Sequence, residues 1–267
     1  MSYQIEGSGT NVRGAGLRRL VDERRVAHGG WCMLPSAFAT EVVSASGCDW
    51  LCLDLQHGLI DDAAMRVMVQ AAAIRSTPVA VRVPWNEPAY IMRALDAGAD
   101  GVIVPMVNTV EDAEKAVSAT RYPPHGQRSW GPLRSLMADS SFDPARGNEQ
   151  SVCIVMVETL EAFENLEGIL SVPGVDSVLV GPNDLAISYT GGNTGAGSSE
   201  RDVAMIREIA AACARHGVAA GISCGSGAEA RRWEAMGYTL LGLPGDAALI
   251  GSGMAAVLAE ARGGAPG

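Results

Sequence analysis

The stretch VCIVMVETLEAFENLEGILSVPGVDSVLVGPND, residues 152–184, decides the fold. It contains two β-rich apolar runs that each stop at a polar residue and give way to a helical pattern, which predicts strands that alternate with helices. Glu158 ends the first run and Asp184 follows the second. Because successive strands of β/α units run parallel, both carboxylates are expected at carboxyl ends of strands, where both could bind one metal ion.

The same alternation continues in both directions along the chain. Eight apolar runs predict strands at 30–34, 50–54, 79–83, 101–105, 152–158, 175–181, 218–223 and 238–243. Amphipathic stretches predict helices at 36–46, 61–74, 88–97, 109–120, 159–170, 201–215 and 226–236. The pattern favours an α/β fold, a closed (β/α)8 TIM barrel. An open doubly wound sheet would also alternate, but no G-x-G-x-x-G or P-loop sequence follows any of these strands.

Length and composition fit one barrel domain that acts on small molecules. The chain has 267 residues, and a (β/α)8 barrel needs roughly 250. We expect a single domain over 16–262, including a C-terminal oligomerisation helix, with flexible tails at 1–15 and 263–267. The formal charge of −10 argues against a nucleic-acid or anionic-membrane partner. Six cysteines without a C-x-x-C pair, and no membrane-span or signal-peptide pattern, predict a cytoplasmic protein.

Two connections are too long for plain turns, and long loops in compact domains usually carry function or disorder. Residues 186–200 are mostly Gly, Ser and Thr, and either a flexible spacer or a lid fits them. Residues 121–151 suit an anionic ligand or a subunit contact. The side chains that suggest this are Arg121, His125, Arg128, Trp130 and Arg134.

Polar residues at the ends of the second and third strands suggest proton transfer and anion binding. Asp54 lies three residues before His57, so its carboxylate could accept the imidazole N–H and leave the other ring nitrogen to take a proton. A purely structural histidine is the alternative. Arg82 lies between valines in the third strand, and burying a guanidinium without an anion is costly. An anionic ligand or an internal salt bridge would satisfy it.

The fifth and sixth strands end in the two carboxylates. Strand alternation places Ile154, Met156 and Glu158 on one face. Glu158 could instead cap the next helix, and Asp184 could be a simple N-cap. Gly181 allows close backbone approach, and the helix start after it offers unpaired N–H groups to a carboxylate or phosphate.

Polar residues at the same end of four strands favour an active site over four unrelated structural roles. Two carboxylates suit a hard divalent ion, Mg²⁺ or Mn²⁺, although Co²⁺ or Zn²⁺ could occupy such a site. The chain's single lysine, Lys115, lies in an amphipathic stretch away from the strand ends. A Schiff-base mechanism therefore has no candidate lysine, and carbon–carbon chemistry would use the metal.

The motifs WLCLDLQHG, VRVPWNEP, LDAGADGVIVPMV, ATRYPPHGQR, VMVETLEAFENL and GVDSVLVGPNDL occur in this order along the chain. With them the sequence resembles, from Trp31 to the C-terminal helix, the HpcH/HpaI-type class II pyruvate aldolases, which include 4-hydroxy-2-oxoheptanedioate aldolase and 2-keto-3-deoxy sugar acid aldolases. The resemblance implies a barrel of the phosphoenolpyruvate/pyruvate type. It also implies reversible, metal-dependent cleavage of 4-hydroxy-2-oxo acids to pyruvate, or a close analogue, and an aldehyde through a metal-stabilised enolate.

The resemblance assigns roles to the residues at the strand ends. Glu158 and Asp184 match the family's metal ligands. His57 matches its catalytic base, with Asp54 behind it. Arg82 matches the residue that contacts the keto oxygen of the substrate.

The resemblance also implies the substrate pocket and the assembly. Gly181, Pro182 and Asn183 belong to the turn that binds the substrate carboxylate, and Trp31 matches a pocket wall. Asp96 matches a residue that such enzymes lend to the site of a neighbouring subunit. The implied assembly is a homo-oligomer, a hexamer built as a trimer of dimers.

The sequence departs from well-known members at three places. Met156 replaces a Gln two residues before the metal-binding Glu, Gln56 replaces a Glu before the catalytic His, and the 128–134 loop, RSWGPLR, differs beside the expected acceptor pocket. A coenzyme A ester lyase of the citrate or malyl type, or an oxaloacetate decarboxylase, would fit the same barrel. A catalytically decayed binding or scaffold protein is a further alternative, with Met156 as the first lesion; the retained His57 and Arg82 argue against it.

Overall fold

A computed structural model describes residues 16–192 and 199–263 of the chain. The predicted tail at 1–15 lies outside the described residues. So do 264–267, nearly all of the predicted C-terminal tail, and 193–198, the centre of the Gly-rich connection.

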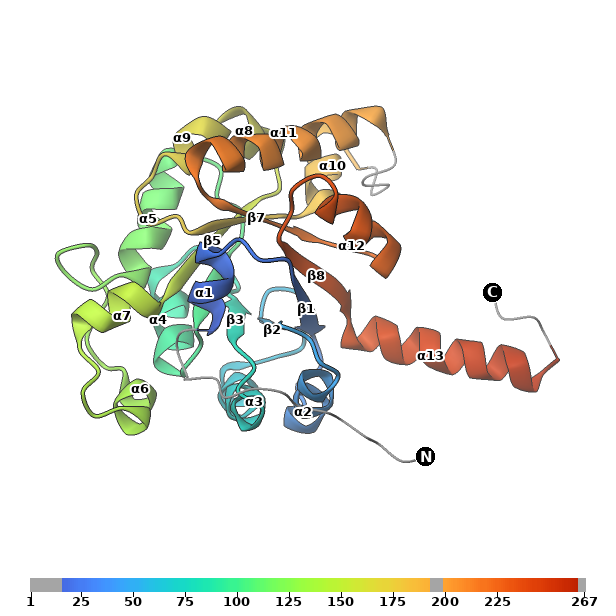
Figure 1. Ribbon diagram of the computed structural model, residues 1–267, viewed down its shortest axis with the longest axis horizontal. Helices are drawn as coiled ribbons and strands as arrows, with labels where there is room; N and C mark the ends of the chain where they lie inside the picture. The colour runs from blue at the N-terminus through green and yellow to red at the C-terminus, as the bar shows by residue number, and fades with distance from the viewer. Residues whose placement is uncertain (1–15, 193–198, 264–267) are drawn as a thin grey trace.

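Eight parallel strands pair in chain order and close into a barrel, because β1 also pairs with β8 (Figure 1). The predicted (β/α)8 TIM barrel is confirmed. The strands are β1 Ala27–Cys32, β2 Trp50–Asp54, β3 Val79–Arg82, β4 Gly101–Val104, β5 Val152–Val157, β6 Ser177–Val180, β7 Ala219–Ser223 and β8 Leu240–Gly245. The helices are α1 Gly16–Asp22, α2 Ala37–Ala45, α3 Asp62–Ile74, α4 Pro88–Asp96, α5 Val110–Thr120, α6 Leu133–Ala138, α7 Pro144–Gln150, α8 Leu160–Glu164, α9 Leu166–Leu170, α10 Pro182–Thr190, α11 Glu200–His216, α12 Gly227–Glu234 and α13 Asp246–Ala261.

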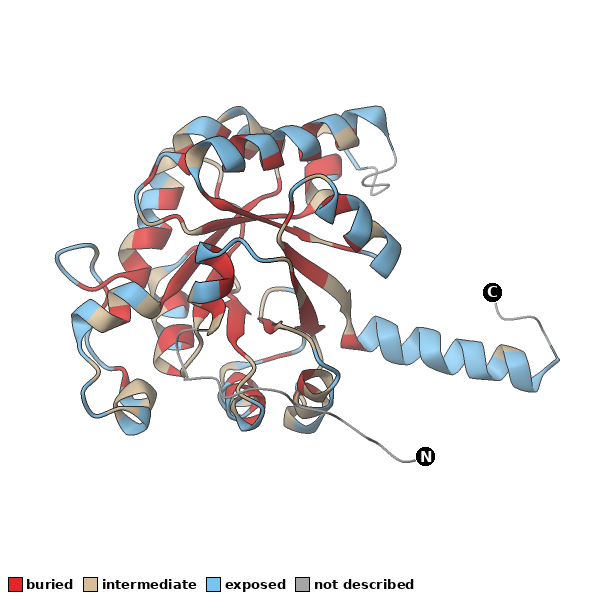
Figure 2. Ribbon diagram, in the orientation of Figure 1, coloured by how far each residue is buried: buried red, intermediate tan, exposed pale blue. Residues whose placement is uncertain are grey.

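Strand alternation divides the hydrophobic residues into two clusters. Side chains such as Ile103 and Ile154 fill the inside of the barrel, while their neighbours Val102 and Val155 pack outward against the helices. Because successive side chains of a strand point to opposite faces, every strand contributes to both clusters. The strands are accordingly buried almost throughout, the helices packed on the barrel expose one side to solvent, and α13 is exposed along nearly its whole length (Figure 2).

The structure corrects four expected boundaries. Strand β1 begins at Ala27, three residues before the predicted start. Its backbone pairs with β2 and β8 even at its glycines, a residue type that is rare in strands and that therefore obscured the start in the sequence. The helix expected over 159–170 is broken at Asn165, whose side-chain amide donates to the Asn108 carbonyl at 2.9 Å. The 121–151 connection contains α6 and α7, and α10 extends to Thr190, inside the expected spacer.

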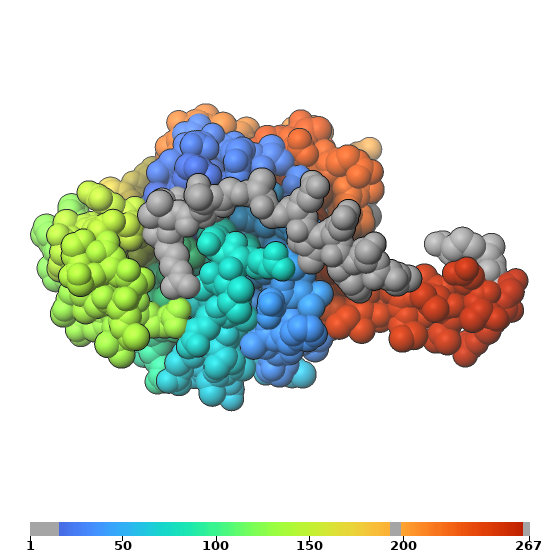
Figure 3. Space-filling view, turned by 60° about the horizontal axis from the view of Figure 1, so that its bottom comes forward, coloured from blue at the N-terminus to red at the C-terminus, as the bar shows by residue number. Residues whose placement is uncertain are grey.

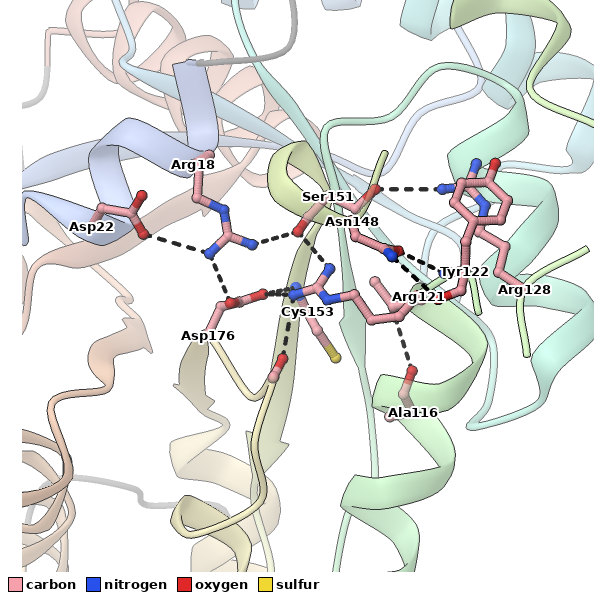
Figure 4. A network of polar contacts seen from close by, with 12 residues as sticks. Arg18, Asp22, Ala116, Arg121, Tyr122, Arg128, Asn148, Ser151, Cys153 and Asp176 are labelled. Carbon is pink, nitrogen blue, oxygen red and sulfur yellow. Dashed lines mark hydrogen bonds and ion pairs between the residues drawn. The ribbon is translucent and has the colours of Figure 1, made fainter. Parts of the chain in front are cut away.

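The N-terminal end of the barrel is closed by α1. Leu17 and Leu20 join the inner cluster, so α1 seals this end with apolar side chains. Arg18 anchors the helix to Asp176 at 2.7 Å, and Arg121 binds the second oxygen of the same carboxylate at 2.6 Å (Figure 4). The Cys153 backbone N–H also donates to Asp176. Within residues 16–192 and 199–263, the N-terminal end is therefore filled, and the opposite end, where the strands have their carboxyl ends, is the candidate entrance for a ligand.

Helix α13 projects away from the barrel (Figures 1 and 3). Its apolar side chains Leu249, Ile250, Met254 and Val257 are between 53% and 61% exposed. Helices of soluble domains normally bury such a stripe. Within residues 16–192 and 199–263, no helix is both long and apolar enough to span a membrane.

The barrel interior predicts a sharp cost for filling one glycine. A Cβ at Gly29 would lie 2.3 Å from the fully buried Trp50 indole, whereas a Cβ at Gly227 would meet nothing within 4 Å. We expect Gly29→Ala to lower the free energy of unfolding by roughly 1–3 kcal/mol through overpacking, and Gly227→Ala to leave it nearly unchanged. Differential scanning calorimetry of both variants measures this, and equal melting temperatures would contradict it.

Candidate active site

The predicted site residues lie at the carboxyl ends of the strands. Asp54 and Arg82 are the last residues of β2 and β3 and face each other in register. Glu158 directly follows β5, and Asp184 lies in the first turn of α10, after β6. This is the open end of the barrel, where (β/α)8 enzymes place their chemistry.

Asp54 and Arg82 form a buried ion pair. Arg82 donates through Nε to Asp54 Oδ1 at 2.9 Å and through Nη2 to Oδ2. Trp31 donates its indole N–H to Asp54 Oδ2 at 3.1 Å, and its ring lies 5.1 Å from the Arg82 guanidinium carbon. The sequence predicted either an anionic ligand or an internal salt bridge for Arg82. The structure contains the internal salt bridge. Trp31 is buried in this cluster, at the inner wall of the barrel mouth.

The expected contact between Asp54 and the His57 ring is absent from the described residues. Asp54 Oδ1 instead accepts the backbone N–H groups of Gln56 at 3.0 Å and His57 at 3.1 Å. Because Arg82 and Trp31 bind the same carboxylate, Asp54 shapes the β2–α3 turn and does not orient the imidazole. The His57 side chain is exposed at the barrel mouth. The amide oxygen of Gln56 is buried without a hydrogen-bond partner.

Glu158 is a buried carboxylate that forms no ion pair with any cation of the described residues. It is 2% exposed, and its Oε1 accepts the Met106 backbone N–H at 2.7 Å. Burial raises the pKa of Glu158 to about 7, and the charge of Asp184 adds to the rise. The Met106 hydrogen bond and the charge of Arg82 oppose it. The environment of Glu158 therefore favours the neutral acid until a positive charge arrives.

The turn that follows β6 brings Asp184 towards Glu158. Gly181 is the N-cap of α10, and Asp184 lies in the first turn, so Asp184 is not the N-cap. A Cβ at Gly181 would lie 2.7 Å from Glu158 Oε2, which explains the glycine. Pro182 and Asn183 begin the helix; Pro182 has no N–H group, so Gly181 and Asn183 supply the N–H groups at this helix start. Glu158 does not cap the helix after β5 either, because Thr159 does so.

Met156 lies on the same face as Glu158, as strand alternation predicts. It belongs to the inner cluster with Ile154 and is 1% exposed. Its methyl carbon would lie 3.2 Å from a Cβ at Gly181. The thioether therefore packs against the turn that carries Asp184, below the two carboxylates.

Asp96 is separated from the other predicted site residues. It ends α4 at the N-terminal end of the barrel, and its side chain is 33% exposed. Arg128 binds it at 2.8 Å, and the guanidinium of Arg128 lies 4.5 Å from the Tyr122 ring centre. Figure 4 shows Arg128 beside Tyr122, in the 121–151 connection. Asp96 thus cannot serve the site of its own barrel.

The donor set of the mouth fits a divalent ion with two protein ligands. Glu158 and Asp184 interact electrostatically, and Glu158 lacks a compensating cation at contact distance. Among the described residues, no group of three or more His, Cys, Asp or Glu side chains could hold a metal. Two carboxylates with further positions left to substrate and water are the arrangement that hard ions such as Mg²⁺ accept.

Comparison with known proteins identifies the family. The family model HpcH/HpaI aldolase/citrate lyase matches residues 28–236. The chain belongs to this family. It is 36% identical over 249 residues to a hydroxypyruvate/pyruvate aldolase of Rhizorhabdus wittichii, covering 92% of this chain and 98% of that relative. It is 37% identical over 224 residues to a 5-keto-4-deoxy-D-glucarate aldolase of Klebsiella pneumoniae, covering 83% and 87%.

A solved structure supports the fold. Macrophomate synthase superposes with a TM-score of 0.85 at 26% identity, covering 98% of this chain and 95% of that chain. The resemblance inferred from the motifs is confirmed, including the phosphoenolpyruvate/pyruvate type of barrel. The chain is an enzyme, a carbon–carbon lyase.

Sequence reasoning missed one residue of this arrangement, Met106, and one internal ion pair, that of Arg128 with Asp96. Met106 contributes only its backbone N–H, and no sequence pattern indicates which main-chain N–H group will donate to a carboxylate. Arg128 was expected to meet an anionic ligand or another subunit, but it also forms an internal pair with Asp96. The spacing of Asp96 and Arg128 in the sequence does not predict this ion pair.

The raised pKa of Glu158 predicts a pH dependence of stability. In the metal-free protein the folded state keeps this proton up to about pH 7, while the unfolded group ionises near 4.5. Its contribution is full below about pH 4.5 and is lost as the pH rises through 7, a difference of about 3 kcal/mol. Glu158→Gln should remove that loss. Urea unfolding of EDTA-treated protein at pH 5 and 8 tests this, and identical pH slopes in both proteins would contradict it.

Proposed function

We propose that this enzyme is a metal-dependent aldolase that reversibly cleaves 4-hydroxy-2-oxo acids to pyruvate, or a close analogue, and an aldehyde. The observation that carries the proposal is the pair Glu158 and Asp184 beside Arg82 at the open end of the barrel. The names of its relatives, a hydroxypyruvate/pyruvate aldolase and a 5-keto-4-deoxy-D-glucarate aldolase, support a 2-oxo acid substrate.

Glu158 and Asp184 would hold the divalent ion, with Mg²⁺ or Mn²⁺ favoured and Co²⁺ or Zn²⁺ as possible occupants. When bound, such an ion supplies Lewis-acid polarisation of the substrate oxygens. It would also supply the positive charge that the environment of Glu158 lacks. The N–H groups of Gly181 and Asn183, at the start of α10, are suited to the substrate carboxylate.

Arg82 stabilises negative charge on the keto oxygen of the substrate. Its Nε and Nη2 groups are held by Asp54, so the planar guanidinium is fixed before the substrate arrives. Among the described residues no hydrogen bond to its Nη1 group is present, which leaves that group for the substrate. A preorganised donor costs no reorganisation when charge develops, and this is how such groups lower a barrier.

His57 moves the proton of the 4-hydroxyl group. On cleavage the ring takes this proton as the bond between C3 and C4 breaks and the aldehyde carbonyl forms. The electron pair of that bond remains on the pyruvate half, which then takes a proton at C3. Asp54 fixes the His57 backbone at the mouth, so the exposed ring can reach the substrate. Trp31 and Met156 would line the pocket, and Met156 would influence how the aldehyde is held.

The proposed assembly is a homo-oligomer, a hexamer built as a trimer of dimers, in which subunits share sites. Two observations support it. The apolar side of α13 is exposed in a single chain, and a neighbouring barrel could cover it. Asp96 is held by Arg128 at the barrel end that faces away from its own site, where its carboxylate could serve the His57 of a neighbour.

The proposed metal site can be tested because metal binding and proton transfer are assigned to different residues. Activity on a 4-hydroxy-2-oxo acid should vanish with EDTA and return with Mn²⁺, Mg²⁺ or Co²⁺. Glu158→Ala and Asp184→Ala should lose metal affinity, whereas Arg82→Lys and His57→Ala should keep it and lose turnover, by roughly 10²–10⁴-fold for His57. Mn²⁺ titration and product analysis by chromatography measure both. Full activity in EDTA, or inactivation by borohydride with pyruvate, would contradict the proposal.

The shared site predicts recovery of activity in mixed oligomers. Asp96→Ala and His57→Ala should each be impaired alone. When the two variants are co-assembled, some sites contain both groups intact, and activity should partly return. The matched control is a mixture of His57→Ala with Glu158→Ala chains. Both residues belong to the same barrel, so no mixed site contains both intact and activity should not return. No recovery in the Asp96 mixture, or a fully active monomer in sedimentation, would refute the shared site.

A further inference from the structure

Met106 adopts a backbone conformation that its residue type disfavours. Its φ of +55° lies in the left-handed region, which among non-glycine residues of 16–192 and 199–263 occurs only at Arg24, Ser76 and Met106. This conformation is unfavourable for methionine, because its Cβ crowds the following carbonyl oxygen. Such conformations persist where the surroundings fix them, and they cluster at functional sites.

The strained residue holds Glu158. Met106 follows β4 and donates its backbone N–H to Glu158 Oε1 at 2.7 Å. The same loop is tied to the β5–α8 corner through Asn108, which accepts from the Thr159 hydroxyl at 2.6 Å and from the Asn165 amide at 2.9 Å. The end of β4 is therefore fastened to the segment that carries Glu158 by three hydrogen bonds.

The hydrogen bond distinguishes the two oxygens of Glu158. Oε1 is taken by Met106, while Oε2 faces Gly181, where any Cβ would come within 2.7 Å. Asp184 lies three residues beyond this glycine, in the first turn of α10. Oε2 is thus the oxygen turned towards the β6–α10 turn, which leads to Asp184.

We infer that Met106 is a positioning residue for the proposed metal site: its left-handed backbone aims one N–H at Oε1 and so presents Oε2 of Glu158 to the ion. The inference rests on the proposed function. What matters is the backbone conformation and not the methionine side chain, which is only half-buried. Groups that orient metal ligands in this way typically contribute 10–100-fold to metal affinity.

Substitutions that differ in tolerance of positive φ test the inference. Met106→Gly and Met106→Asn accept the left-handed region and should keep the Mn²⁺ dissociation constant within about threefold. Met106→Val is β-branched and resists it, so its affinity should fall by roughly 10–100-fold. Met106→Leu should resemble the wild type. Mn²⁺ binding is measured on the full-length protein by electron paramagnetic resonance of the free ion.

A side chain that merely packs predicts the opposite order, with Leu and Val best and Gly and Asn worst. That order, or a folded Val variant that binds Mn²⁺ as tightly as the wild type, overturns the inference. Where the Val variant does not fold, an Asn variant that binds Mn²⁺ more than about threefold more weakly than the Leu variant overturns it. Ser76→Val is the matched control, since Ser76 has the same φ of +55° in the turn after α3, at the closed end of the barrel. It should lower the melting temperature and leave Mn²⁺ affinity unchanged.

Failure of the proposed function is distinguishable from failure of this inference. Wild-type protein that binds no Mn²⁺, or binds it as tightly as Glu158→Gln, overturns the metal site and the inference with it. Tight wild-type binding that Glu158→Gln abolishes, without dependence on the conformation at position 106, overturns the inference alone.

Discussion

The open end of the barrel depends on one buried charge. Asp54 is completely buried, and burial by itself raises the pKa of a carboxyl group. Hydrogen bonds from Arg82, with its charge, outweigh that effect, so the pKa of Asp54 lies below its ordinary value. Trp31 and two backbone N–H groups complete the set of donors. One carboxylate thereby fixes the guanidinium, the indole wall and the turn that carries His57.

Glu158 has the contrasting environment, which is the one that the proposed metal site requires. Both carboxylates are buried, but Asp54 has a cation in contact and Glu158 has only one N–H. Desolvation therefore dominates at Glu158 and raises its pKa to about 7, while pairing dominates at Asp54. An ion that neutralised Glu158 and Asp184 together would remove an unfavourable burial of charge, which links metal binding to stability.

The two ends of the barrel differ in their packing: the closed end stabilises the fold, and the open end contains the candidate site. At the closed end, Asp176 joins Arg18 and Arg121 and holds α1 over the inner cluster. At the open end, glycine and strained backbone take the place of close packing, as at Gly181 and Met106. The apolar side of α13 and the partly exposed carboxylate of Asp96, at the N-terminal end of the barrel, are the surfaces on which the proposed contacts with a second copy rest.

The sequence alone determined the barrel and which residues lie at the carboxyl ends of its strands. Alternating apolar runs specify strands locally, and period two placed Met156 and Glu158 on one face, because these patterns depend only on neighbours along the chain. Partners of polar atoms were decided by the tertiary structure. Asp54 binds Arg82 and not the His57 ring, and Met106 supplies its N–H to Glu158. Several groups lie within reach of each carboxylate, and only the packed geometry selects which donor arrives at bonding distance.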